Sequence, residues 1–208
     1  MKRIEINTDP KLAWAEALDT GVRSQLGPIL EELENGGGVQ YSSKGGVGAG
    51  HGAEYWPILS RIQRMEREQP HLSAIGHVLC HPDTEARNSY LDAAADTVEA
   101  KVIALIPSWT DGKVWRQAKK DKVSHLIRVA LMERSENLSN ELPDWSPEKI
   151  GAKMAEWYGA PITTRDWARD WLPTWCVIQA VINNLEADAI EPISDVIGDM
   201  IHKAKRAA

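Results

Sequence analysis

Apolar side chains recur every three or four residues along most of the chain, which is the spacing of amphipathic helices. Ile4 and Ile6 alternate with polar neighbours and predict one short strand near the start. Before residue 107, helices are expected at about 10–22, 28–34, 57–65, 71–81 and 84–106. The last of these has a predicted buried stripe of Leu91, Ala94, Val98, Val102 and Leu105. The pattern predicts a mostly α-helical fold.

The second half of the chain continues the helical spacing after a turn at 108–112. A helix from about residue 113 should bury Val123, Leu126, Ile127, Ala130 and Leu131. Pro173 and Pro192 each precede an apolar stretch, so two separate helices are expected there, because proline favours the first position of a helix. Both are too apolar to stand alone, so they either complete the C-terminal part or pair with a second copy. We expect an N-terminal helical region over 1–106 and a C-terminal helical domain over 113–208.

Composition narrows the class of protein. A chain of 208 residues suits one large domain or two small ones. Cys80 and Cys176 are the only cysteines and lie far apart, which favours a reducing compartment over a disulfide scaffold. The start has no signal-peptide pattern, and no run of 18 apolar residues occurs. We therefore expect a soluble, cytoplasmic protein without a membrane partner.

Charge is distributed unevenly along the chain. The formal net charge is −6, so any binding to nucleic acid requires a local basic patch. Residues 113–134 supply such a patch, because this segment contains seven Lys and Arg and only two acidic residues, Asp121 and Glu133. Such a run is often a solvated helix face. The alternative is contact with phosphates, for which we name Arg116, Lys119 and Lys120.

Residues 146–172 match the plan of a helix-turn-helix. Ser146 and Pro147 predict a helix start, Gly159 predicts its end, and Thr163 is expected to cap a second helix with Asp166 three residues later. In this motif the start of the second helix meets base edges in the major groove. The predicted base-reading positions are Thr163, Thr164, Arg165 and Arg169, and the predicted phosphate contacts on the first helix are Lys149 and Lys153. The alternative is a helical hairpin with a Trp-rich core.

A glycine-rich segment at 36–52 raises the question of nucleotide binding. Lys44, Gly45, Gly46, Val47 and Gly48 match the lysine-first phosphate loop of partition-type ATPases. Ala49 and Gly50 then replace its second lysine and its metal-binding hydroxyl, and no strand ending in Asp follows. We expect no nucleotide cofactor. The segment is either a flexible linker or a compact loop that closes on another surface.

A short run, HVLCH, invites a metal interpretation. His77, Cys80 and His81 lie within about one helical turn, and Cys176 is a conceivable fourth ligand. A Cys-x2-Cys pair is missing, and a buried Cys with nearby His is the commoner arrangement. No nucleophile–base or paired-carboxylate pattern stands out. We expect neither a metal site nor an enzyme.

With this layout the chain resembles the Q-type transcription antiterminators of lambdoid phages and their prophage-derived relatives of the AlpA type, most specifically at 146–172. The resemblance implies a DNA element near a promoter and RNA polymerase as partners. Nascent RNA and a second copy on DNA are further candidate partners. It assigns DNA reading to Thr163, Thr164, Arg165 and Arg169. It also implies a segment that narrows the RNA exit channel, which falls on Tyr41, Lys44, Gly45, Gly46, Val47, Gly48 and His51. The alternative function is a conventional helix-turn-helix activator or repressor.

Overall fold

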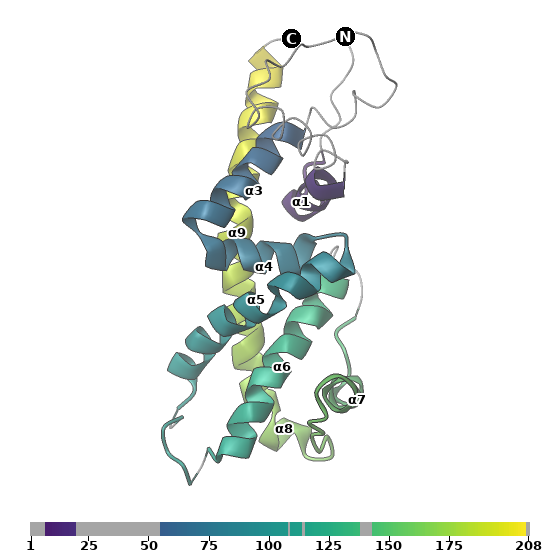
Figure 1. Cartoon of the computed structure of the whole chain (residues 1–208), viewed down its shortest axis with the longest axis vertical. Helices are drawn as coiled ribbons and strands as arrows, with labels where there is room; N and C mark the ends of the chain where they lie inside the picture. Colours follow the sequence, from purple (N-terminus) through teal and green to yellow (C-terminus); the bar gives the residue numbers. More distant parts are fainter. Residues whose placement is uncertain (1–6, 20–54, 108, 114, 138–142, 207–208) are drawn as a thin grey trace, which may run out of the picture.

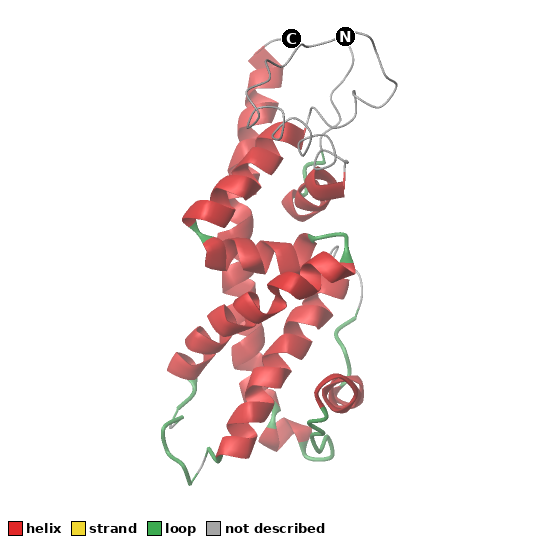
Figure 2. Cartoon of the chain, viewed as in Figure 1, coloured by secondary structure: helices red, strands yellow, loops and turns green. Residues whose placement is uncertain are grey.

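The structure is a computed structural model that describes residues 7–19, 55–107, 109–113, 115–137 and 143–206. Within these ranges it contains eight helices joined by loops and no strand (Figure 2). The expected strand at 4–6, the expected helix at 28–34 and the glycine-rich segment at 36–52 lie outside the described residues. The helices are α1 (Pro10–Asp19), α3 (Trp56–Glu68), α4 (Pro70–Cys80), α5 (Thr84–Leu105), α6 (Gln117–Glu136), α7 (Pro147–Tyr158), α8 (Trp167–Asp170) and α9 (Leu172–Arg206).

Helix α9 is the axis of the molecule. Its 35 residues correspond to about 50 Å at 1.5 Å per residue. Helices α1 and α3 pack along its C-terminal half, α4 crosses its middle, and α5 and α6 lie along its N-terminal half (Figure 1). The buried side chains of all these helices form one connected core. In the described part of the chain, no helix is both long and apolar enough to cross a membrane.

The prediction of two helices after Pro173 is wrong, because α9 continues through Pro192. One stripe at helical spacing stays buried on both sides of the proline, and the packing of this stripe outweighs the cost of about 3 kcal/mol for an interior proline. Asp188, whose carbonyl loses its usual donor, is exposed, so water can reach that group. The stripe consists of Ile178, Ile182, Leu185, Ala189, Ile193 and Ile197.

Most of the other core predictions are confirmed, although Leu91 is only partly buried. Ala94, Val98 and Val102 of α5 are fully buried, and so are the five predicted core residues of α6. Leu105, however, is 60% exposed. The helix ends at this residue, and the extended backbone at Ile106 turns the Ile106 side chain into the core instead. The periodic pattern therefore predicts the wrong environment for its last residue, because the helix ends there.

Three charged side chains join α1, α6 and α9. Lys11 Nζ lies 2.8 Å from Glu186 Oε1, and Arg134 Nε lies 2.8 Å from Glu186 Oε2. Lys11 and Glu186 are both buried, so the charge of Lys11 is compensated by Glu186, and the charge of Glu186 is compensated by Lys11 and Arg134 together. Arg134, which belongs to the basic run found in the sequence, therefore serves the interior of the fold.

Candidate nucleic-acid interface

One end of the molecule brings two basic segments together. The loop before α6 and the first turns of α6 lie beside the connection from α7 to α9, at the lower end of Figure 1. Lys122 Nζ donates a 2.7 Å hydrogen bond to the Pro161 carbonyl, and Lys119 Nζ lies 5.7 Å from the Trp171 ring centroid. We define the basic end as the seven cations of these segments: Lys113, Arg116, Lys119, Lys120, Lys122, Arg165 and Arg169.

Most cations of the basic end have no carboxylate partner. Among the described residues, all of them except Arg169 are free of ion pairs. The later part of the same basic run behaves differently, since Arg128 pairs with Asp92 at 2.9 Å and Arg134 pairs with Glu186. The sequence patch therefore divides into two parts. The cations of its C-terminal part, Arg128 and Arg134, are paired with carboxylates, and the cations of its N-terminal part form no ion pair with any described residue.

Tryptophan rings support the lysines of the basic end. The Trp109 and Trp115 ring centroids lie 4.9 Å apart. Lys119 Nζ lies 4.4 Å from the Trp115 centroid, and Lys120 Nζ lies 5.3 Å from the Trp109 centroid. Cation–π contacts of this length fix where an ammonium group sits without neutralising it. This support was not predicted, although the four-residue spacing between Trp115 and Lys119 is visible in the sequence.

The first helix of the predicted helix-turn-helix is confirmed. Ser146 Oγ accepts a hydrogen bond from the Lys149 backbone N–H at 3.3 Å and caps α7. Gly159 ends the helix in the left-handed conformation, with φ of 59°. The Gly159 N–H donates to the Ala155 carbonyl at 3.1 Å, which is the bond of an αL motif, and the Ala160 N–H donates to the Met154 carbonyl at 3.2 Å.

The second helix differs from the prediction. Residues 160–166 are mostly non-helical, and α8 is a single turn of four residues that begins at Trp167, after Asp166 rather than after Thr163. Pro161 disfavours helical backbone at the residue before it. Trp171 is buried, and α9 begins directly after it, which leaves no room to extend α8. The described chain thus lacks a recognition helix of ordinary length after α7.

The four predicted base-reading residues fall into different environments. Thr163 and Arg165 are exposed. Thr164 is half-buried, and its Cγ2 lies 2.9 Å from the place that a Cβ on Gly151 would occupy, so it packs on α7. Arg169 is exposed but bonded to carboxylates, with Nε 2.7 Å from Asp170 Oδ1 and Nη2 3.0 Å from Asp170 Oδ2. Only Thr163 and Arg165 are both exposed and free of such pairing.

The two predicted phosphate contacts on α7 also lie beside carboxylates. Lys149 Nζ lies 3.8 Å from the Trp145 ring centroid and 3.9 Å from Glu136 Oε2. Lys153 Nζ lies 2.9 Å from Glu156 Oε2. Glu136 ends α6, whereas the basic end lies at the start of that helix, about 30 Å away for 20 residues. The structure therefore does not bring Lys149 together with the basic end.

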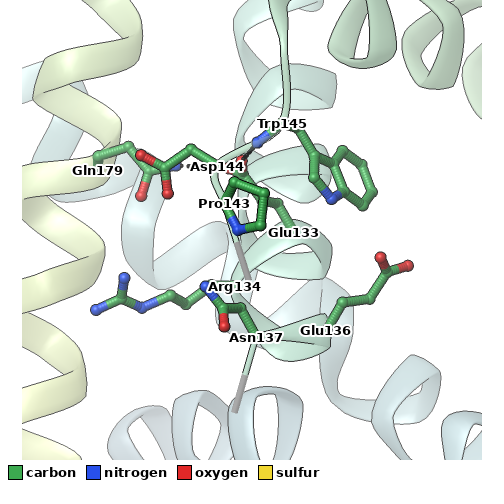
Figure 3. Close-up of a pocket in the computed structure, with 8 residues that line it drawn as sticks. All are labelled: Glu133, Arg134, Glu136, Asn137, Pro143, Asp144, Trp145 and Gln179. Carbon is green, nitrogen blue, oxygen red and sulfur yellow. Dashed lines mark hydrogen bonds between the residues drawn. The ribbon is translucent and has the colours of Figure 1, made fainter. Parts of the chain in front are cut away.

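A small pocket at the other end of α6 is organised by Glu133. The Glu133 carboxylate accepts hydrogen bonds from the Trp145 N–H at 2.6 Å and from Gln179 Nε2 at 2.9 Å (Figure 3). The pocket holds about 20 Å³, room for a water molecule. Burial raises the pKa of Glu133, and the hydrogen bond from Trp145 opposes that rise. Glu133 thus fastens the start of α7 to α9.

Three of the four residues of the metal hypothesis, His77, Cys80 and His81, are buried. His77 Nε2 lies 2.8 Å from Glu66 Oε1, and its ring stacks on Tyr90 at 4.2 Å. Cys80 is buried, and burial raises the pKa of its thiol far above the ordinary value. Cys176 is exposed on α9. Across the residues that the structure describes, no three His, Cys, Asp or Glu side chains are grouped to hold a metal ion.

The residues named for the RNA exit channel, from Tyr41 to His51, lie outside the described residues. No family model, curated protein or solved structure matches this chain. The basic end is therefore the feature of the molecule from which a function can be inferred.

Proposed function

We propose that this protein binds double-stranded DNA through its basic end and acts as a transcription antiterminator on RNA polymerase. The observation that carries the DNA-binding part is the gathering of six cations without carboxylate partners from two separate segments. Uncompensated Lys and Arg side chains on one surface are the electrostatic footprint of a nucleic-acid-binding protein.

The distribution of charge along the whole chain supports DNA binding through the basic end. The two segments of the basic end contain seven cations and four aspartates, whereas the full chain has a net charge of −6. The rest of the sequence is therefore strongly acidic, and phosphates would be repelled by it and attracted to this end. The N-terminus of α6, a helix of 20 residues, adds its dipole at the same place.

The side chains suggest a division of roles within the interface. Arg116, Lys119 and Lys120 are assigned to phosphates, because Arg116 is exposed, Lys119 and Lys120 lie over Trp rings, and all three are at the start of α6. Arg165 and Thr163, exposed just before α8, are the candidates for base edges. A guanidinium suits guanine, whose O6 and N7 it can bond together.

The antitermination part of the proposal rests on the resemblance in organisation. It assigns the contact with the RNA exit channel to the glycine-rich segment at 36–52. A conventional activator or repressor would use the same basic end. Transcription through an intrinsic terminator separates the two functions, because an activator raises initiation and leaves the fraction of readthrough unchanged.

Binding to a mixed-sequence duplex tests the DNA-binding part directly. The triple variant Arg116→Ala, Lys119→Ala, Lys120→Ala should lower the slope of log K against log salt by about 0.9 for each phosphate that is no longer neutralised. Its matched control is Lys203→Ala, Lys205→Ala, Arg206→Ala, which removes three exposed charges from the far end of α9. Equal effects of the two triple variants would show that only net charge matters and would refute the assignment of the interface.

A further inference from the structure

Arg169 is the exception at the basic end. Its guanidinium bonds both oxygens of Asp170, at 2.7 and 3.0 Å, and lies 3.4 Å from Asp166 Oδ2. The Arg169 side chain is nevertheless 73% exposed. Because the guanidinium is exposed, water can solvate its charge, and no carboxylate is needed to neutralise it. The pairing is therefore not needed to keep Arg169 in the fold.

The geometry of the pair resembles that of an arginine on a phosphate. Carboxylate and phosphate oxygens both accept two parallel N–H bonds from a guanidinium. Asp170 occupies the donors that a DNA phosphate would use. Lys119 contributes to a lowered pKa at Asp170, after the larger effect of the Arg169 hydrogen bond, so Asp170 lies within the field of the basic end. Its negative charge offsets that field where DNA would approach.

We propose that Asp170, assisted by Asp166, is an internal competitor for Arg169 that limits sequence-independent binding to the DNA backbone. This inference rests on the proposed DNA-binding function. Without DNA, the guanidinium stays on the carboxylates. A duplex recruits it only where the other contacts position a phosphate closely enough to replace Asp170. The carboxylates thus raise the ratio of specific to non-specific affinity.

Asp170→Asn tests the competition by freeing Arg169. On a mixed-sequence duplex, the variant should bind more tightly than wild type, and its salt slope should steepen by about 0.9, the value for one added phosphate contact. Between 50 and 200 mM salt, its affinity should therefore fall about threefold further than that of wild type. Asp121→Asn is the matched control, because Asp121 is an exposed aspartate of the same end that bonds Gln117 rather than an arginine.

A double variant separates release of Arg169 from simple loss of a negative charge. In Arg169→Ala, Asp170→Asn the added contact cannot form, so the salt slope should return to the wild-type value. The inference is overturned if Asp170→Asn leaves the slope unchanged, if Asp121→Asn steepens it equally, or if the double variant keeps the steeper slope. If wild type and the Arg116, Lys119, Lys120 triple variant bind the duplex equally, the DNA-binding assignment fails first, and the inference falls with it.

Discussion

The Trp14 indole fills the space directly above Gly76. A Cβ built on Gly76 would lie 2.2 Å from Cη2 of that ring, well inside any tolerated contact. Trp14 is fully buried, and its ring also meets His77 edge-on, so it cannot swing aside. The close approach of α1 to α4 therefore depends on a glycine at this position.

Gly76→Ala should lower the free energy of unfolding by about 1–3 kcal/mol, the usual cost of overpacking a core. Thermal unfolding followed by circular dichroism measures it. Gly198→Ala on α9 is the control, because nothing lies within 4 Å of a Cβ there. That variant should be neutral or more stable by up to about 1 kcal/mol, since alanine favours a helix interior over glycine. Similar stabilities for the two variants would contradict the packing of α1 on α4.

Arg165→Ala should relax DNA specificity more than it weakens backbone binding. The loss of a bidentate bond to a base costs about 1–3 kcal/mol on the preferred sequence. On a mixed-sequence duplex the effect should be small. Fluorescence anisotropy on both duplexes at one salt concentration measures the ratio, once the preferred sequence has been selected from random duplexes. An equal loss of affinity on the two duplexes would identify Arg165 as a phosphate contact instead.

Glu133→Gln should make the stability of the protein depend differently on pH. Because the folded-state pKa of Glu133 is raised, the folded protein binds this proton more readily than the unfolded chain does. The stability that the protonated Glu133 contributes to the folded state is fully present below the ordinary pKa of glutamate, and it is lost as pH rises through the raised pKa of Glu133. Wild type should therefore gain stability relative to Glu133→Gln as pH falls from 7 towards 4.

The amide variant is a fair comparison, because Gln179 can turn its own amide oxygen towards the new side chain. Denaturant unfolding of both proteins at several pH values gives the difference directly. A gap between the two free energies that stays constant with pH would show that the Glu133 carboxylate is not perturbed by burial.

Replacing residues 44–50 by a Gly/Ser linker of equal length should abolish terminator readthrough and leave DNA binding unchanged. The replacement keeps the reach of the segment but removes Lys44 and Val47. A transcription assay and a mobility-shift assay on the same preparations test both halves. Full readthrough by the variant would make these seven residues a spacer.

Local signals in the sequence predicted much of the fold. Asp9, Ser146 and Gly159 mark helix ends where the structure has them, because capping is decided by neighbouring residues. The prediction of a helix start at Pro192 was wrong, since the effect of this proline depends on the packing of residues far from it in the sequence. The length of α8 is limited by the burial of Trp171 in the core, and this limit could not be predicted from the neighbouring residues.

The candidate site was harder to predict than the helices. The sequence shows a block of positive charge, but it does not show which cations acquire carboxylate partners. Arg134 meets Glu186 across 52 residues, and Glu133 meets Gln179 across 46. Arg169, by contrast, pairs with its immediate neighbour, so this partner was visible in the sequence.

Because α9 continues through Pro192, one unbroken helix sets the distance between the parts of the molecule that pack along it. The basic end lies at the N-terminal end of this helix, and α1 and α3 pack farther along the same unbroken helix. The contact of Lys11 with Glu186 lies 14 residues along α9 from Leu172, which is about 21 Å at 1.5 Å per residue and equals the axial length of about six base pairs. On the proposed function, a duplex held at the basic end would therefore be kept at a set distance from whatever α1 and α3 contact.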